Sequence, residues 1–228
     1  MNGAIILARI DSSRFPNKAI TKVGNKLLIQ HCIDEVKKLG KVKVILATSA
    51  RKIDDPLEQV AKISDIDCFR GDSENVAKRV LDCIIKNKID SFARINGDSP
   101  FTRVSLLEDG FQIINHNNYD LVTNLLPRRY PYGMSVEIIR GETFRKVYAK
   151  ISESKYYTEH ISSIFYDQQE EFKIGKIPYK KGLNHSDVRL TVDTLQDKEL
   201  IDKMFYIDTE IGNKSISEIV SLYLKVKG

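Results

Sequence analysis

The sequence has no tryptophan and little of what disulfide-rich or zinc-centred proteins depend on, with three cysteines and four histidines in 228 residues. Cys32, Cys68 and Cys83 form no CxxC pair and cannot all pair with one another, so we expect buried thiols in a reducing cytoplasm. The absence of HExxH and of a second histidine at metal spacing argues against zinc. No serine or cysteine sits in a nucleophile turn, which argues against a catalytic triad.

Long hydrophobic runs and tracts of one charge are also missing. No segment approaches the roughly 18 apolar residues that span a membrane, and no basic, apolar leader precedes the first strand-like segment. We therefore expect a cytoplasmic protein without a membrane partner. The net charge is +5 but the basic residues are dispersed. This indicates either a plain solvated surface or a preference for anionic small molecules over nucleic acid.

Alternating apolar segments predict the fold of the first half. The run at 3–9 is typical of a buried strand, and 27–39 carries apolar residues at helical spacing. We expect strands at 3–9, 42–48, 66–70, 91–96 and 119–124, and helices at 27–39, from 54, at 73–87 and at 103–117, with Ser73 as a cap. This alternation predicts an α/β fold, a three-layer, Rossmann-like and mostly parallel sheet with helices on both faces.

The regular alternation ends in the second half. There we expect an irregular loop at 126–133, strands at 134–140, 172–179 and 188–193, and helices from 142, at 154–170, from 194 and from 215. We therefore predict one domain over residues 1–228 that contains a small antiparallel and helical insertion at about 126–187, suited to dimerisation.

Polar clusters follow four of the predicted strands, with the sequences ARIDSSR, TSARKIDD, RGDSEN and NGDSP. In sheets of this kind, ligands bind outside the carboxyl ends of the strands. The coincidence of polar residues with these ends predicts a polar ligand at this edge of the sheet.

The loop after the first strand carries Arg9, Arg14 and Lys18. Two guanidiniums and an ammonium suit a polyphosphate. Neither GxxxxGK[ST] nor GxGxxG occurs, so a phosphate would be held by side-chain cations and loop amides rather than by a glycine-lined backbone. The alternative to a phosphate-binding loop is a surface loop that carries a few basic residues.

Two aspartates are candidate metal ligands. Asp98 follows a predicted strand in NGDSP, and Asp193 ends the predicted strand in VRLTVD. Mg²⁺ favours one or two carboxylates together with substrate phosphates, so these two could share one ion. Either residue could instead be only a turn or cap residue.

Four further candidate residues lie in the second half. Glu159 and His160 are neighbours within an expected helix, so their side chains should not face the same way. His185 lies in a loop that could reach a substrate, although a lone histidine is more often structural. Tyr132, in LPRRYPYG, either packs or lines a pocket.

Taken in order, these motifs resemble a known family. ILARIDSSRFPNKAI resembles the ARxxSxRxPxK signature of the cytidylyltransferases that activate acidic sugars, which include the CMP-KDO synthetases and acylneuraminate cytidylyltransferases. The branch of the spore coat polysaccharide biosynthesis protein F is the most similar. Its further motifs appear here in order as ATS, FRG, NGDSP, PYGMSVE, EH and TVDT, over about residues 3 to 206.

The resemblance implies a fold of the nucleotide-diphospho-sugar transferase type, and a homodimer. It also implies transfer of CMP from CTP to an acidic sugar, nonulosonic or KDO-like, with release of pyrophosphate, in cell-surface polysaccharide or glycan synthesis. Mg²⁺ would be held by Asp98 and Asp193. The implied catalytic residues are Arg9, Arg14, Lys18 and Asp98. The implied nucleotide-binding residues are Ala8, Arg9, Ser13, Arg14, Lys18, Thr48, Arg70, Gly71, Asn75 and Gly97. The implied sugar-binding residues are Arg94, Tyr132, Glu137, Glu159, His160 and His185.

The chain departs from the branch in two places. Residues 96–103 are NGDSPFTR where TGDCPLID is usual, and Met134-Ser135 replace Leu-Asp. Both departures lie toward the sugar side, so they concern the acceptor more than the chemistry. Other hypotheses stay open: another nucleotide or a phosphorylated acceptor, a glycosyltransferase with a similar sheet, or a nucleotide-binding regulator without catalysis.

Overall fold

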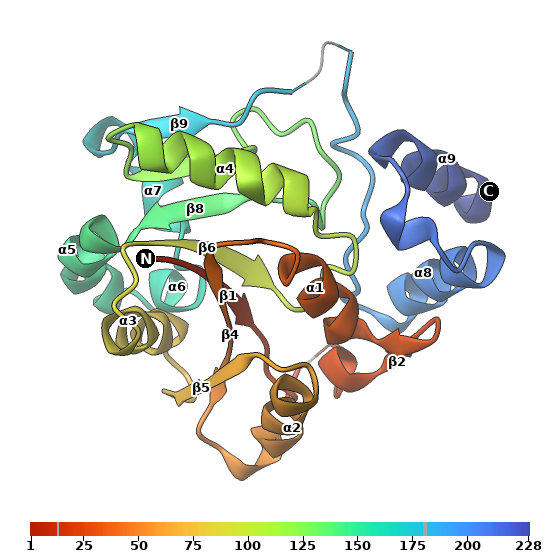
Figure 1. The fold of residues 1–228 in the computed structure, drawn as a ribbon, viewed down its shortest axis with the longest axis horizontal. Coiled ribbons are helices and arrows are strands. Elements are labelled where there is room, and N and C mark those ends of the chain that lie inside the picture. The colour runs from red at the N-terminus through yellow and green to blue at the C-terminus, as the bar shows by residue number, and fades with distance from the viewer. Residues whose placement is uncertain (13, 180–181) are drawn as a thin grey trace.

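The computed structural model describes residues 1–12, 14–179 and 182–228. Its centre is a seven-stranded sheet in the order β5-β4-β1-β6-β8-β7-β9 (Figure 1). The strands are β1 (Asn2–Leu7), β4 (Val42–Ser49), β5 (Asp67–Gly71), β6 (Ser91–Asn96), β7 (Leu121–Thr123), β8 (Glu137–Arg140) and β9 (Ile174–Lys176), with a separate hairpin of β2 (Lys22–Val23) and β3 (Lys26–Leu27).

Helices cover both faces of this sheet. They are α1 (Leu28–Val36), α2 (Asp55–Ile63), α3 (Val76–Lys86), α4 (Val104–His116), α5 (Gly141–Ser152), α6 (Lys155–Glu159), α7 (Ser163–Asp167), α8 (Leu195–Ile207) and α9 (Ile216–Lys227). Short 3₁₀ turns are η1 (Lys18–Ile20), η2 (Lys52–Asp54), η3 (Gln169–Glu171) and η4 (Ile211–Asn213). The predicted α/β architecture is confirmed.

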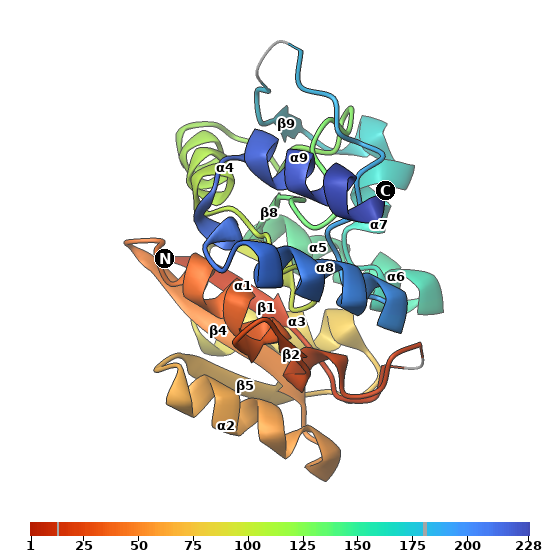
Figure 2. The same cartoon turned by 90° about the vertical axis from the view of Figure 1, so that its right-hand side faces the viewer.

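Two hydrophobic cores flank the sheet because successive side chains of a strand point to opposite faces. In β1, Ala4 and Ile6 join the core beneath α1, α2, α4, α8 and α9, whereas Ile5 joins the core beneath α3, α5 and α7. Helices α8 and α9 pack side by side on the α1 side of the sheet (Figure 2). The three layers leave the carboxyl ends of β1 and β6 at one edge.

The direction of β8 interrupts the parallel series. β1 pairs in parallel with β4 and β6, but β8 is antiparallel to both β6 and β7. The regular alternation predicted that β7 would lie beside β6 as the next parallel strand. This prediction is wrong, because β8 lies between the two strands. The segment 136–139 is buried on both faces, which suits a central strand, and this burial explains why it enters between them.

Two predicted elements are wrong. The expected helix at 154–170 is broken at His160, where the backbone leaves helical geometry. Its two parts bury different amounts of surface, since α6 has no buried residue whereas α7 buries Ile164 and Phe165. The expected strand at 188–193 is an extended segment outside the sheet. Its alternating burial arises because Val188, Leu190 and Val192 join the hydrophobic core while its backbone bonds to loops, which produces the same period of two as a strand does.

One predicted helix cap is also wrong. Helix α3 begins after Asn75, whose side-chain oxygen accepts from the Lys78 amide at 2.7 Å, rather than after Ser73. The Asp72 carboxylate accepts from the next two free amides, those of Glu74 and Asn75, and so forms a turn ahead of the helix. The caps at Thr194 and Ser215 are formed as capping boxes.

None of the helices in the described residues is both long enough and apolar enough to cross a membrane. Cys32 and Cys83 are buried as expected, whereas Cys68 is only partly buried.

Burial should protect the thiols chemically. It raises the pKa of Cys32 and Cys83 to about 12 and that of Cys68 to about 11. Since the thiolate is the reactive form, we expect each native thiol to react at pH 8 at least roughly a hundredfold more slowly than in urea. Labelling with Ellman's reagent checks this, and a native thiol that reacts at the unfolded rate would contradict it.

Candidate active site

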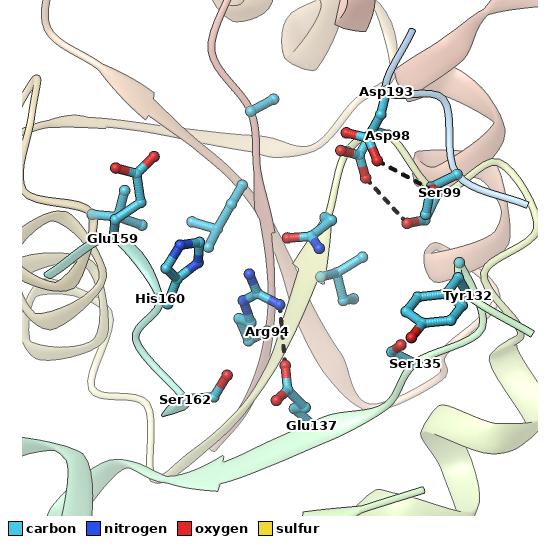
Figure 3. A pocket seen from close by; sticks show the side chains of 18 of the residues that line it. Arg94, Asp98, Ser99, Tyr132, Ser135, Glu137, Glu159, His160, Ser162 and Asp193 are labelled. Carbon is cyan, nitrogen blue, oxygen red and sulfur yellow. Dashed lines mark hydrogen bonds and ion pairs between the residues drawn. The ribbon is translucent and has the colours of Figure 1, made fainter. Parts of the chain in front are cut away.

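A cavity of about 700 Å³ opens at the carboxyl ends of β1 and β6 (Figure 3). Its wall is built from the loop after β1, the turn after β6, the loop before β8, the break between α6 and α7, and the segment before α8. Twelve of the predicted site residues line it: Ala8, Arg9, Arg14, Lys18, Arg94, Gly97, Asp98, Tyr132, Glu137, Glu159, His160 and Asp193. The sheet edge chosen from the sequence is therefore where these side chains gather.

Cationic side chains outnumber carboxylates on this wall. The cations are Arg9, Arg14, Lys18, Arg79, Arg94, Arg128 and Arg189, and the carboxylates are Asp11, Asp98, Glu137, Glu159 and Asp193. An excess of positive charge in a concave site attracts anionic ligands.

The Lys18 ammonium lies between two carboxylates from distant parts of the chain. Its Nζ is 2.7 Å from Asp98 Oδ2 and 3.2 Å from Asp193 Oδ1. Burial disfavours the charged amine, but the two carboxylates outweigh it and raise the pKa of Lys18. Arg14 adds a second cation, with a nitrogen 2.9 Å from the same oxygen of Asp193. The two predicted metal ligands therefore converge on one cationic atom.

A backbone hydrogen bond explains why Asp98 and Asp193 meet. The Val192 amide donates to the Asp98 carbonyl at 3.0 Å, which ties the extended segment before α8 to the turn after β6. The amide of Asp193 donates to Asp197 Oδ2 at 3.1 Å, next to the capping box of α8. The position of Asp193 is therefore set by the start of a helix and not by a strand.

A buried carboxylate anchors the loop after β1. Asp54 is fully buried, and its Oδ1 accepts from the Ile10 amide at 2.7 Å. The Ser49 hydroxyl and the Arg51 guanidinium donate to its other oxygen. The sequence indicated Asp54 only as a helix start. Its polar neighbours in TSARKIDD were the available signal for this wider role.

Arg79 is a site residue that the sequence did not predict. It is 1% exposed and lines the cavity from α3, where it donates to the carbonyls of Asp72 and Ser73. Arg9 donates to the same Ser73 carbonyl at 3.0 Å. Burial, with a contribution from Arg9, lowers the pKa of Arg79 to about 10, so it remains cationic at neutral pH. An arginine on the buried face of an amphipathic helix was the signal for it.

The far side of the cavity holds a hydrogen-bonded network. Arg94 donates to Glu137 Oε2 at 3.1 Å, and Tyr166 donates to Glu137 Oε1 at 2.8 Å. Figure 3 shows the pair of Arg94 and Glu137 between the His160 side and the Tyr132 side of the cavity. Glu137 thereby holds Arg94 in a fixed position.

Glu159 and His160 both line the cavity, which corrects the expectation that they face different ways. The helical geometry on which that expectation rested ends at Glu159, because α6 stops there. Glu159 lies 3.8 Å from the guanidinium of Arg9, and the His160 ring lies 5.0 Å from that of Tyr156.

Five predicted site residues do not line the cavity. Arg70 donates to two carboxylates of α2 and to the carbonyls of Ser49 and Arg51. Thr48 is fully buried in β4, and Gly71 ends β5. Asn75 caps α3, and the backbone amide of His185 donates to a carbonyl of the loop before β8. Their ligand contacts remain predictions. Ser13 lies outside the described residues.

The family model described as cytidylyltransferase matches residues 3–226. The chain belongs to the cytidylyltransferase family. It is 24% identical to the spore coat polysaccharide biosynthesis protein SpsF of Bacillus subtilis over 225 residues, which cover 96% of this chain and 92% of SpsF.

Two solved structures of cytidylyltransferases share the fold. A cytidylyltransferase from Leptospira borgpetersenii serovar Hardjo-bovis superposes with a TM-score of 0.86 and 26% identity, covering 98% of this chain and 94% of that one. A CMP:2-keto-3-deoxy-manno-octonic acid synthetase complexed with CTP gives a TM-score of 0.66 and 18% identity, over 91% and 99% of the two chains. This cytidylyltransferase is accordingly a nucleotidyltransferase.

Loss of the Asp54 anchor should destabilise this cytidylyltransferase. Asp54→Ala leaves the Ile10 amide, the Ser49 hydroxyl and the Arg51 guanidinium without their buried acceptor. We expect the free energy of unfolding in urea to fall by about 3 kcal/mol. Asp82→Ala, which removes a carboxylate from a surface pair on α3, should cost less than about 1 kcal/mol. Equal losses in the two variants would contradict the anchoring role.

Proposed function

We propose that this cytidylyltransferase transfers CMP from CTP to an acidic sugar of nonulosonic or KDO-like type, with Mg²⁺, for cell-surface polysaccharide or glycan synthesis. The observation that carries the proposal is the convergence of Arg14 and Lys18 with Asp98 and Asp193 on one wall of the cavity. A cytoplasmic location and a homodimer joined through residues 126–187 belong to the same proposal.

The cations of the loop after β1 suit the triphosphate. Arg9, Arg14 and Lys18 all line the cavity, and Arg79 lies behind them on α3. Guanidinium groups bind phosphate oxygens through paired N–H donors, whereas lysine supplies a compact charge. The relation in fold to a synthetase solved with CTP supports this placement.

The residues fit a magnesium ion. No group of three or more His, Cys, Asp and Glu gathers to hold a metal in residues 1–12, 14–179 and 182–228. Asp98 and Asp193 nevertheless already share one cation, the ammonium of Lys18. Two carboxylates that complete their shell with substrate phosphates are a typical magnesium set. When bound there, Mg²⁺ would neutralise phosphate charge.

The reaction we propose is a substitution at phosphorus. The acceptor hydroxyl oxygen forms a bond to the α-phosphorus, the bond to the bridging oxygen of the β-phosphate breaks, and the hydroxyl proton is released. Pyrophosphate leaves with the electron pair. Positioning and charge stabilisation account for most catalysis of this kind. Arg9, Arg14 and Lys18 would hold the phosphates and stabilise the charge that develops on them.

The acceptor half is assigned to the wall formed by β8 and by the loop before it. The sheet order places β8 on one side of β6, whereas β1, β4 and β5 lie on the other. Arg94 and Glu137 lie at this half, together with Tyr132. The likeness to the synthetase of a keto-deoxy sugar acid supports an acidic acceptor.

Asp98→Asn should remove most of the transferase activity. It takes away one of the two carboxylates that we propose hold Mg²⁺, and so we expect pyrophosphate release from CTP and an acidic sugar to fall at least about a hundredfold. EDTA should abolish release by the wild type, and added Mg²⁺ should restore it. Coupled detection of pyrophosphate measures both effects.

Asp109→Asn is the matched control, because Asp109 is an exposed carboxylate on α4 outside the cavity. This variant should keep wild-type activity. Release of pyrophosphate by Asp98→Asn at the wild-type rate, or a wild type that is indifferent to EDTA, would refute the proposed metal role.

CTP should stabilise the protein more than UTP, GTP or ATP at equal concentration, because a ligand that binds the native state raises its melting temperature. Arg14→Ala should lose most of the CTP-induced shift. The side chain of Arg14 is 67% exposed, so its removal should leave the melting temperature without ligand nearly unchanged. Thermal-shift measurements check both statements. A larger rise in melting temperature with another nucleotide would indicate that this nucleotide, and not CTP, is the substrate.

A further inference from the structure

Arg128 differs from the other cations on the cavity wall. It lies in the loop between β7 and β8, where it is half-buried. Its NH1 donates to the hydroxyl of Ser135 at 3.2 Å, and its guanidinium carbon lies 4.0 Å from the centre of the Tyr132 ring. Over residues 1–12, 14–179 and 182–228, no carboxylate comes within 4.0 Å of it.

The other cations of the cavity already have strong acceptors. Five of them lie within 4.0 Å of a carboxylate, namely Arg9, Arg14, Lys18, Arg94 and Arg189. Arg79 donates to two backbone carbonyls. Arg128 alone among these described side chains makes its hydrogen bond to a neutral hydroxyl. Its remaining N–H donors are therefore suited to an incoming anion.

The position of Arg128 separates it from the proposed triphosphate cations. Those cations belong to the loop after β1, whereas Arg128 precedes β8, on the other side of β6. Figure 3 shows Ser135 and Tyr132 close to one another and on the same side of the cavity as Ser99. An anion bound by Arg128 would thus belong to the acceptor and lie apart from the nucleotide loop.

Tyr132 orients the guanidinium. The ring has Arg128 at 4.0 Å and Arg189 at 4.9 Å from its centre. A guanidinium stacked on a ring keeps its in-plane N–H groups available, and two of them can bind a carboxylate in parallel. Partial burial strengthens such a contact and raises the cost of leaving the cation without a partner.

We propose that Arg128, held on the Tyr132 ring beside the uncharged Ser135, binds the carboxylate of the acceptor sugar and selects acids over neutral sugars. The assignment rests on the proposed function and names the residue that would determine acceptor class. Ser135 contributes by being neutral, since an aspartate at that position would pair with Arg128 and compete with the substrate.

The test compares acceptor acids with their neutral methyl esters. With CTP saturating, pyrophosphate release is measured for 3-deoxy-manno-octulosonate, N-acetylneuraminate and the methyl ester of each. For the better acid, Arg128→Met should raise the acceptor KM roughly tenfold to a hundredfold, the loss expected for one charge-assisted contact. The ratio of kcat/KM for acid over ester should collapse toward one. The CTP-induced rise in melting temperature should persist, which shows a folded protein.

Three further variants sharpen the result. Arg128→Lys should recover only part of the affinity, because an ammonium lacks the planar pair of donors. Ser135→Asp should raise the acceptor KM about as much as Arg128→Met. Arg129→Met removes the neighbouring charge, which lies near Tyr179, and should leave the acid-to-ester ratio unchanged.

Three outcomes would separate a failure of the Arg128 assignment from a failure of the proposed function. An acid-to-ester ratio that Arg128→Met does not change would overturn the role of Arg128 and leave the proposed function standing. Arg128-dependent use of N-acetylglucosamine 1-phosphate in place of the acids would overturn the carboxylate assignment. A wild type that neither binds CTP nor releases pyrophosphate with any acceptor would overturn the proposed function itself.

Discussion

The site depends on one electrostatic contact, the ammonium of Lys18 between Asp98 and Asp193. It joins three segments that lie far apart in the chain, namely the loop after β1, the turn after β6 and the segment before α8. Two carboxylates so close together repel each other unless a cation lies between them. A positive charge is therefore needed at this point, and the protein supplies it from its own loop.

Buried polar networks hold the surrounding cavity in shape. Asp54 anchors the loop after β1 through the amide of Ile10, and Glu137 of β8 anchors Arg94. In both networks, a carboxylate that is almost fully buried accepts from several donors. Removing one member leaves the others unsatisfied at low dielectric, so such networks give a site rigidity. The two halves of the cavity are thus fixed independently of each other.

The distribution of charge distinguishes Arg128 from the other cations of the cavity wall. Cations of the loop after β1 are matched to carboxylates in the same wall, whereas Arg128 has a hydroxyl and an aromatic ring beside it and no carboxylate within 4.0 Å among the described residues. Under the roles we propose, a change near Ser135 would alter which acceptor binds without touching Lys18 or the aspartates.

Local patterns in the sequence determined most of the strands and helices, the starts of the helices at Thr194 and Ser215, and the edge of the sheet where the site lies. Spacing records which side of a segment is buried and does not record what covers it. Only the tertiary structure therefore decided that β8 enters the sheet antiparallel, and that the backbone of 188–193 bonds to loops and not to the sheet. For the same reason it alone placed Arg79 and Asp54 at the site and Arg70 away from it. Each of these positions depends on partners far away in the sequence.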